Sequence, residues 1–202
     1  MNQDISPIKF CENFLYRKDL LKYFNETIFL DTFAFCLIIQ GKFDENHNWN
    51  TLAGDKNYFM NMTTYKKLMD FLSYCNGKLI ITPAVIGESL RHIFEAIETK
   101  YSYNPNKKKI EDEFVDFLKS EIKMFEEKQP YFHEILNHSW IDKVKEHKLR
   151  DRLEIGELSI FVESDKCSKH KAIITRDAFK RNKQGECYEC SNTILVQLDK
   201  FM

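Results

Sequence analysis

Short apolar runs recur along this chain and predict the strands of a sheet. The first is Thr27 to Leu30, and Asp31 follows it at once. The later runs are Lys78 to Thr82 (KLIIT), Lys171 to Thr175 (KAIIT) and Thr193 to Val196 (TILV). Continuous apolar runs of this length suit strands that are buried on both faces of a parallel sheet.

Between these runs, apolar residues recur at the spacing of amphipathic helices. We expect a helix over Phe33 to Ile39, and another that starts at Thr82-Pro83, because threonine can cap a helix and proline is tolerated at its first position. The other apolar stripes are Leu68, Phe71, Leu72 and Cys75; Ile86, Leu90, Ile93, Phe94 and Ile97; and Phe114, Phe117, Leu118, Ile122 and Phe125. The first of these stripes should end at Asn76-Gly77 and the last near Gln129-Pro130.

Strands and helices alternate throughout the chain, which favours an α/β fold. We expect a three-layer sandwich, in which a central parallel sheet of about four to five strands is flanked by helices. Residues 41–61 are polar and rich in Asn, Asp and Gly, and predict a loop. Residues 100–109 interrupt the helical pattern, residues 131–152 carry a weak one, and a late helix should follow Ile155.

Length and charge limit the class of protein. The 202 residues suit a single domain over 1–202, with insertions near 41–61 and 100–150. The formal net charge is −1, whereas a generic nucleic-acid binder is usually more basic. A cluster of carboxylates would itself mask a basic surface, so this charge does not exclude a nucleic-acid partner.

The chain carries no sequence signal for a membrane or for secretion. No apolar run reaches the roughly 18 residues of a membrane span. The N-terminus lacks the basic region and apolar run of a secretory signal. We therefore expect a cytoplasmic protein with no membrane partner, whose six cysteines are reduced.

Four acidic residues lie where ligands bind in such folds, outside the carboxyl ends of the strands. Asp31 ends the first strand, and Asp177 stands two residues after KAIIT. Glu88 falls about one and a half turns into the helix after the second strand, and Glu157 in the first turn of a late helix. Each has an ordinary explanation, as a helix cap, a partner of a helix dipole or a solvent-facing side chain. Their joint placement is what indicates a site.

Four segments of the chain resemble the PIN-domain family, in the family's order. They are IFLDTFAF (28–35), LIITPAVIGESLRHIF (79–94), IGELSIFVES (155–164) and KAIITRDAF (171–179). The resemblance implies that the catalytic residues and metal ligands are Asp31, Glu88, Glu157 and Asp177, with Thr175 as a supporting hydroxyl. Glu157 is a departure, because the family often has Asp there.

Carboxylate oxygens suit hard cations such as Mg²⁺ or Mn²⁺. The resemblance implies one or two such ions and a ribonuclease that hydrolyses RNA phosphodiester bonds. It is compatible with the toxin of a toxin–antitoxin pair, partnered by an antitoxin protein, and equally with an RNA-processing nuclease. PIN proteins commonly form homodimers. The alternatives are a non-catalytic PIN-like module that binds RNA or protein, and a structure-specific DNA nuclease of similar fold.

Basic residues near this site in sequence are expected to contact nucleic acid. They are Arg91, Arg176, Lys180 and Arg181. The run Lys107-Lys108-Lys109 falls in an expected loop, where a solvated face is the more ordinary explanation.

Cysteine and histidine spacings raise the question of a second metal. Cys167-x-x-His170 and Cys187-x-x-Cys190 have the spacing of zinc knuckles. If the two pairs met, it would be at the sheet end opposite the carboxylates, as a structural Zn²⁺ site. The ordinary alternative is a set of reduced cysteines without metal.

Overall fold

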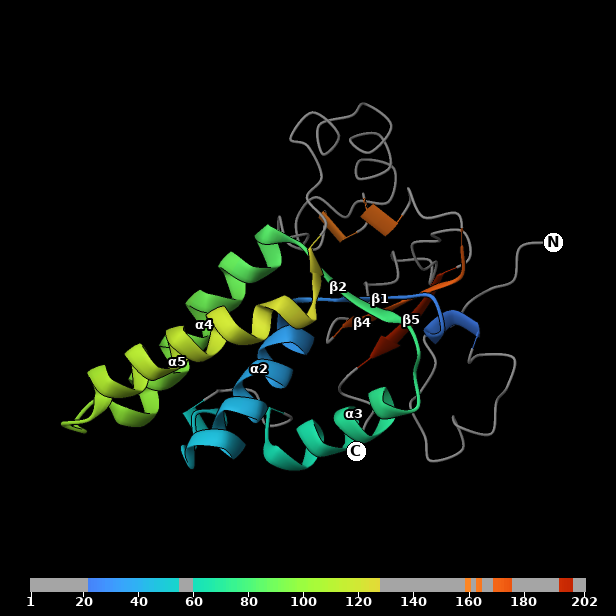
Figure 1. Cartoon of the computed structure of the whole chain (residues 1–202). Helices are drawn as coiled ribbons and strands as arrows, with labels where there is room; N and C mark the ends of the chain where they lie inside the picture. Colours follow the sequence, from blue (N-terminus) through green and yellow to red (C-terminus); the bar gives the residue numbers. More distant parts are fainter. Residues whose placement is uncertain are drawn as a thin grey trace, which may run out of the picture.

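The computed structural model describes residues 22–54, 60–127, 159–160, 163–164, 169–175 and 193–197. The strands are β1 (Thr27–Leu30), β2 (Lys78–Ile81), β3 (Glu126–Glu127), β4 (Lys171–Thr175) and β5 (Thr193–Gln197). The longer helices are α2 (Thr32–His47), α3 (Met62–Ser73), α4 (Pro83–Tyr101) and α5 (Lys107–Glu121). The strands lie in the order β3-β2-β1-β4-β5, and each neighbouring pair is parallel (Figure 1). The prediction of an α/β protein with a parallel sheet and helices is confirmed.

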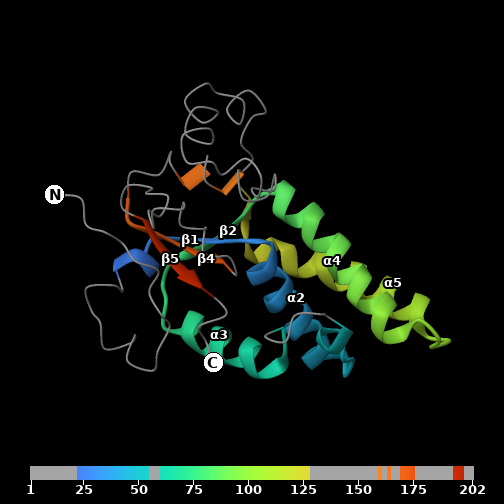
Figure 2. The ribbon, with the colours of Figure 1, turned by 180° about the vertical axis from the view of Figure 1, so that it is seen from behind.

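Strand β1 lies in the middle of the sheet, between β2 and β4. Its register places Phe29 opposite Ile80 of β2 and Leu30 opposite Ile174 of β4. These side chains are buried, as the apolar run predicts for a strand covered on both faces. Helices α2 and α3 lie on one side of the sheet, and the short helical segments at 159–160 and 163–164 lie on the other (Figures 1 and 2).

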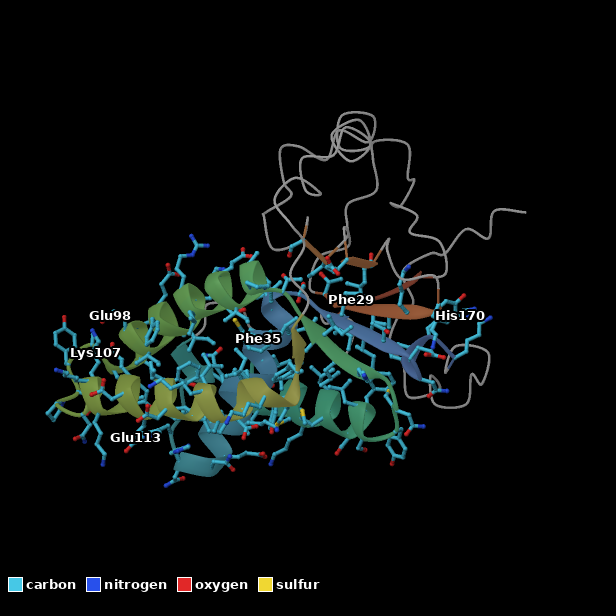
Figure 3. All side chains as sticks on the ribbon, turned by 45° about the horizontal axis from the view of Figure 1, so that its top comes forward. Phe29, Phe35, Glu98, Lys107, Glu113 and His170 are labelled. Carbon is cyan, nitrogen blue, oxygen red and sulfur yellow. The ribbon has the colours of Figure 1, made fainter. Side chains whose placement is uncertain are left out.

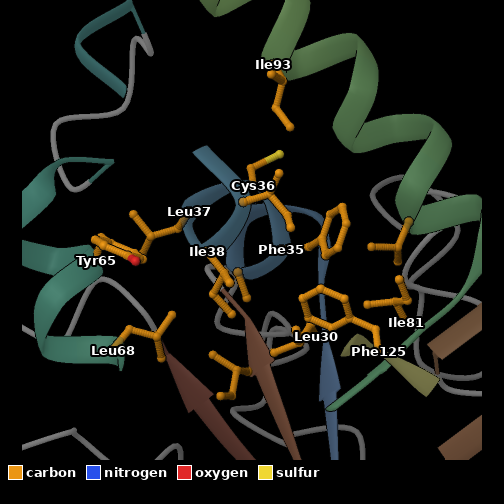
Figure 4. Packing of buried hydrophobic residues seen from close by; sticks show 14 of the residues in the cluster. Leu30, Phe35, Cys36, Leu37, Ile38, Tyr65, Leu68, Ile81, Ile93 and Phe125 are labelled. Carbon is orange, nitrogen blue, oxygen red and sulfur yellow. The ribbon is translucent and has the colours of Figure 1, made fainter. Parts of the chain in front are cut away.

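Helix α2 follows β1 directly, and its residues 34–41 are buried on all sides. Successive residues of a helix are turned by about 100°, so neighbours along α2 face different elements. The ring of Phe35 meets that of Phe125 edge-to-face, with centroids 5.2 Å apart, whereas Cys36 points toward α4 and Leu37 toward Tyr65 of α3 (Figure 4). Helices α3, α4 and the segment after α5 therefore surround α2.

Side-chain caps fix the starts of α2 and α4. Asp31 accepts a hydrogen bond from the Ala34 N–H at the start of α2, with an O···N distance of 2.7 Å. Thr82 caps α4 by accepting from the Val85 N–H, and Pro83 occupies the first helical position. The start predicted at Thr82-Pro83 is confirmed, because both residues satisfy what a helix N-terminus requires.

Helix α2 is longer than the sequence indicates. The loop expected over 41–61 is wrong for residues 41–47, which continue the helix to His47. Gly41 is accommodated because its missing Cβ leaves room for the Tyr65 ring, which a Cβ would overlap. Asn48 ends the helix in the left-handed region, with φ of 55°.

Two helices end earlier in the structure than the sequence predicts. Helix α3 ends at Ser73, before Asn76-Gly77. Helix α5 ends at Glu121 and passes through a 3-10 turn into β3, so a helix that continues to Gln129-Pro130 is wrong. The physical reason is that Phe125 leaves the helix to pack against Phe35.

Some expectations lie outside the described ranges, among them the weak helical pattern at 131–152 and the start of the late helix at Ile155. Within the part of the chain that the structure describes, no helix is long and apolar enough to cross a membrane.

A buried carboxylate near the end of α2 holds the chain that follows the helix. The Oδ1 and Oδ2 atoms of Asp44 accept hydrogen bonds from the Thr51 and Leu52 N–H groups, at 2.7 and 3.0 Å. Asp44 is 5% exposed. Burial raises the pKa of its carboxyl group above the usual value, although the two backbone donors oppose this rise.

This raised pKa gives Asp44 a testable effect on stability. The folded protein holds the proton more tightly than the unfolded chain, so the Asp44 contribution is fully present below the unfolded-state pKa and is lost as the pH rises through the folded-state pKa. We expect the difference in unfolding free energy between the wild type and Asp44→Asn to fall as the pH rises. Urea unfolding from about pH 4 to about pH 7 measures it. A difference that stays constant or grows with pH would rule out this explanation.

Candidate metal site at the carboxyl edge of the sheet

Asp31 lies at the carboxyl end of β1, the middle strand. Its N–H donates to the Ile174 carbonyl of β4 at 3.0 Å, and its Oδ1 accepts from the Ala34 N–H. The residue is 3% exposed. The helix-cap explanation for Asp31 is therefore correct, and the same contacts hold its carboxylate at the edge where a ligand would bind.

Glu88 belongs to α4 and reaches the same edge. Its Oε2 accepts a hydrogen bond from the Thr32 hydroxyl at 2.7 Å. The side chain is half-buried, so it contacts the first turn of α2 instead of pointing freely into solvent. Because Thr32 directly follows Asp31, the structure brings Glu88 to the neighbourhood of Asp31.

Thr175 is the third predicted residue at this edge. It is the last residue of β4 and is fully buried. The register pairs Leu30 with Ile174, so Thr175 and Asp31 are adjacent in space at the ends of paired strands. Asp31, Glu88 and Thr175 therefore converge.

The remaining predicted site residues lie outside the described residues. They are Glu157, Asp177, Arg176, Lys180 and Arg181, together with Cys167, Cys187 and Cys190. Two described positions lie near Glu157 and Asp177 in the sequence. Thr175 stands two residues before Asp177, and Ser159, two residues after Glu157, contacts the Thr82 hydroxyl at the end of β2.

The donor set that the structure describes fits a hard divalent cation. Asp31 and Glu88 supply carboxylate oxygens, which Mg²⁺ and Mn²⁺ prefer. Mg²⁺ is commonly bound by one or two carboxylates, with waters and substrate phosphates completing its shell. Among the described residues, no three His, Cys, Asp or Glu side chains gather around one point. The other two carboxylates of the predicted set, Glu157 and Asp177, are not among these residues.

One predicted cation lies beside this edge. Arg91 is exposed and follows Glu88 by three residues on α4, which places both near one face of the helix. The ring of the next residue, His92, lies tilted against the Phe33 ring, with centroids 5.5 Å apart. Arg91 is therefore an exposed cation one turn along α4 from Glu88.

The lysine run at 107–109 has a structural role instead. It opens helix α5, so its expected placement in a loop is wrong. Lys107 pairs with Glu98 of α4 and with Glu111, and Lys109 pairs with Glu113 at 3.6 Å. Figure 3 shows Lys107 beside Glu98 where α4 and α5 meet. These acidic partners offset the positive charge that a phosphate would need.

His170, of the possible zinc set, lies at the end of the sheet away from α4 and α5 (Figure 3). Its ring meets Tyr23 edge-to-face, with centroids 4.9 Å apart. This location agrees with the expectation that the residue lies opposite the carboxylates. The three cysteines of the set are outside the described ranges, so the zinc site stays a prediction.

Two residues of the site were not predicted from the sequence. Thr32 joins Asp31 to Glu88, and Ser89 donates its hydroxyl to the Thr32 carbonyl at 3.3 Å. The available signal was a hydroxyl residue next to each predicted carboxylate. Such pairs are too common in sequences to have identified the contact.

Comparisons of this chain with protein-family models, with curated proteins and with solved structures find no match. The class is therefore defined by the fold and the site alone. This is an α/β protein with a parallel sheet, in which a buried aspartate ends the middle strand and a half-buried glutamate of α4 accepts a hydrogen bond from the residue after that aspartate.

Proposed function

We propose that this chain is a PIN-like, metal-dependent ribonuclease with a three-layer fold of four to five strands. Asp31, Glu88, Glu157 and Asp177 would hold one or two Mg²⁺ or Mn²⁺ ions. The observation that carries the proposal is the Thr32 hydrogen bond, which brings Glu88 of α4 to the end of β1 where Asp31 lies. Carboxylates from distant segments gather in this way at sites that bind divalent cations.

Each residue has a role in this proposal. Asp31 and Asp177 are the direct ligands, whereas Glu88 and Glu157 complete the shell or orient a water. Bound there, the ions would activate the water and stabilise charge on the phosphate. Arg91, which is exposed beside Glu88, would bind a backbone phosphate.

Chain connectivity supports a role for the two carboxylates outside the described ranges. In the sequence, Asp177 stands two residues after Thr175, which lies beside Asp31. Glu157 stands two residues before Ser159, whose hydroxyl contacts Thr82 at the end of β2.

The alternative is a PIN-like module that binds RNA or protein without cleaving it. Carboxylates that share a site without a cation repel one another, which favours a metal-binding role. A toxin with an antitoxin partner, an RNA-processing enzyme and a homodimer all remain compatible with the proposal, as does a cytoplasmic location.

A metal titration with nucleic-acid substrates tests the proposed function. We expect single-stranded RNA to be cleaved only when Mg²⁺ or Mn²⁺ is added, and DNA flaps to be left intact. Glu88→Gln should lower the cleavage rate by about 100-fold, because the amide removes a charge that the site requires. RNA length on denaturing gels measures both effects.

Glu113→Gln is the matched control. Glu113 of α5 is also half-buried and accepts one hydrogen bond, from Trp49 Nε1 at 2.8 Å. This variant should cleave RNA at the wild-type rate. RNA binding without cleavage at any metal concentration would favour the non-catalytic module, and cleavage of the flaps alone would favour a DNA nuclease.

A further inference from the structure

Thr32 stands between the two carboxylates that the structure describes. It is the first residue of α2, is 6% exposed and directly follows Asp31. Its hydroxyl donates to Glu88 Oε2 at 2.7 Å, a distance typical of a hydrogen bond to a charged acceptor. The contact joins residues that are far apart in sequence, so it depends on the packing of α4 against α2.

The backbone around this hydrogen bond is also held in place. The fully buried Ser89 hydroxyl donates to the Thr32 carbonyl, and the Cys36 thiol donates to the Ser89 carbonyl at 3.7 Å. These contacts lock the first turn of α2 against α4. The Thr32 hydroxyl is therefore presented to Glu88 from a fixed position.

The hydrogen bond orients the Glu88 carboxylate. A glutamate side chain rotates about three bonds, and fixing it costs conformational entropy. The Thr32 hydroxyl engages Oε2, whereas Oε1 accepts no hydrogen bond within the described part of the chain. The protein therefore holds Oε2, and Oε1 is available to bind a ligand.

We propose that Thr32 is a positioning residue, whose hydroxyl orients the Glu88 carboxylate next to Asp31 for divalent-cation binding. This inference rests on the proposed function. It adds that Thr32 fixes the orientation of the Glu88 carboxylate before the cation binds. Groups that hydrogen-bond to a metal ligand commonly set its orientation, and their loss weakens metal binding or activity. An orientation fixed before the ligand arrives reduces the cost of binding.

Two variants test the role of the hydroxyl. Thr32→Val keeps the branched side chain and removes the donor, and we expect it to weaken Mn²⁺ binding by about 10- to 100-fold. In RNA cleavage, kcat should fall while the KM for RNA stays unchanged, since Thr32 is buried and offers little surface to RNA. Thr32→Ser restores the donor and should bind Mn²⁺ within about twofold of the wild type.

Thr64→Val is the matched control. Thr64 is also a buried threonine in the first turn of a helix, and its hydroxyl donates to Asn61 Oδ1 at 3.3 Å. It lies on α3, away from the carboxylates. Thr64→Val should bind Mn²⁺ as the wild type does, even if its urea midpoint falls as much as that of Thr32→Val.

A stability measurement without metal gives an independent readout. If the hydroxyl contacts Glu88, the midpoint shift caused by Thr32→Val should shrink in a Glu88→Ala background. Equal shifts in both backgrounds would overturn the contact.

The outcomes separate this inference from the proposed function. If the wild type binds Mn²⁺ and Thr32→Val binds it equally well, the positioning role is wrong and the proposed function stands. If Thr32→Ser fails to restore binding, the hydroxyl is not the active group. If the wild type neither binds Mn²⁺ nor cleaves RNA, both proposals fall together.

Discussion

Asp31→Asn is expected to lower metal-dependent RNA cleavage by about 1,000-fold while the protein stays folded. The amide carries no charge and is a weaker ligand for Mg²⁺ or Mn²⁺. Asparagine caps helices about as well as aspartate, so the hydrogen bond from the Ala34 N–H can persist. Cleavage rates at saturating metal, together with urea unfolding, separate the two effects.

Two further variants separate the loss of charge at Asp31 from the loss of any buried carboxylate and from the loss of the helix cap. Asp44→Asn neutralises another buried carboxylate of α2, about 20 Å along the helix from Asp31, and should leave cleavage unchanged. Asp31→Ala removes both the charge and the cap, and should lose about 1 kcal/mol of stability in addition to activity. Wild-type cleavage by Asp31→Asn would remove Asp31 from the site.

Gly41→Ala is expected to destabilise the protein by about 1–3 kcal/mol, although alanine is the better helix former. A Cβ at Gly41 would overlap the Cγ, Cδ1 and Cδ2 atoms of Tyr65. These atoms lie near the base of the tyrosine side chain and are held between α2 and α3. The Tyr65 hydroxyl is also tied to Glu45, to which it donates at 3.0 Å. The ring cannot move aside without losing these contacts.

Gly87→Ala is the control for this prediction. Gly87 also lies inside a helix, α4, but apart from its chain neighbours and the backbone of α4 itself, no atom of the described residues lies within 4 Å of the position its Cβ would take. Alanine there should stabilise the protein by about 0.5–1 kcal/mol. Urea unfolding of the two variants should therefore shift in opposite directions. Stabilisation by both would mean that α3 does not pack against α2 as described.

The fold was predictable where the local sequence determines the structure. The strands β1, β2, β4 and β5 coincide with the apolar runs, and Thr82-Pro83 starts α4. The later part of α2 was missed because residues 41–47 are mostly polar and begin with Gly41, a composition that is also typical of loops. Strand β3 has two residues, too few for any pattern.

The candidate site was predictable in part for the same reason. A residue that ends a buried strand has its position set by the strand, so Asp31 and Thr175 fall at the expected edge. The direction of Glu88 depends on how α4 packs against α2, which no local pattern records. The sequence therefore left a solvent-facing Glu88 open, and the Thr32 hydrogen bond shows where the side chain points. The roles of Glu157 and Asp177 stay predictions.

Calorimetric titration of the metal-free protein with Mn²⁺ tests the central claim most directly. The wild type should bind Mn²⁺ with a saturable heat at one or two ions per chain, and the Asp31→Asn, Glu88→Gln double variant should give no saturable heat. The control pair Asp44→Asn and Glu113→Gln, combined in one protein, should bind as the wild type does. Equal binding by the wild type and by the site variant would contradict a metal site at this edge of the sheet.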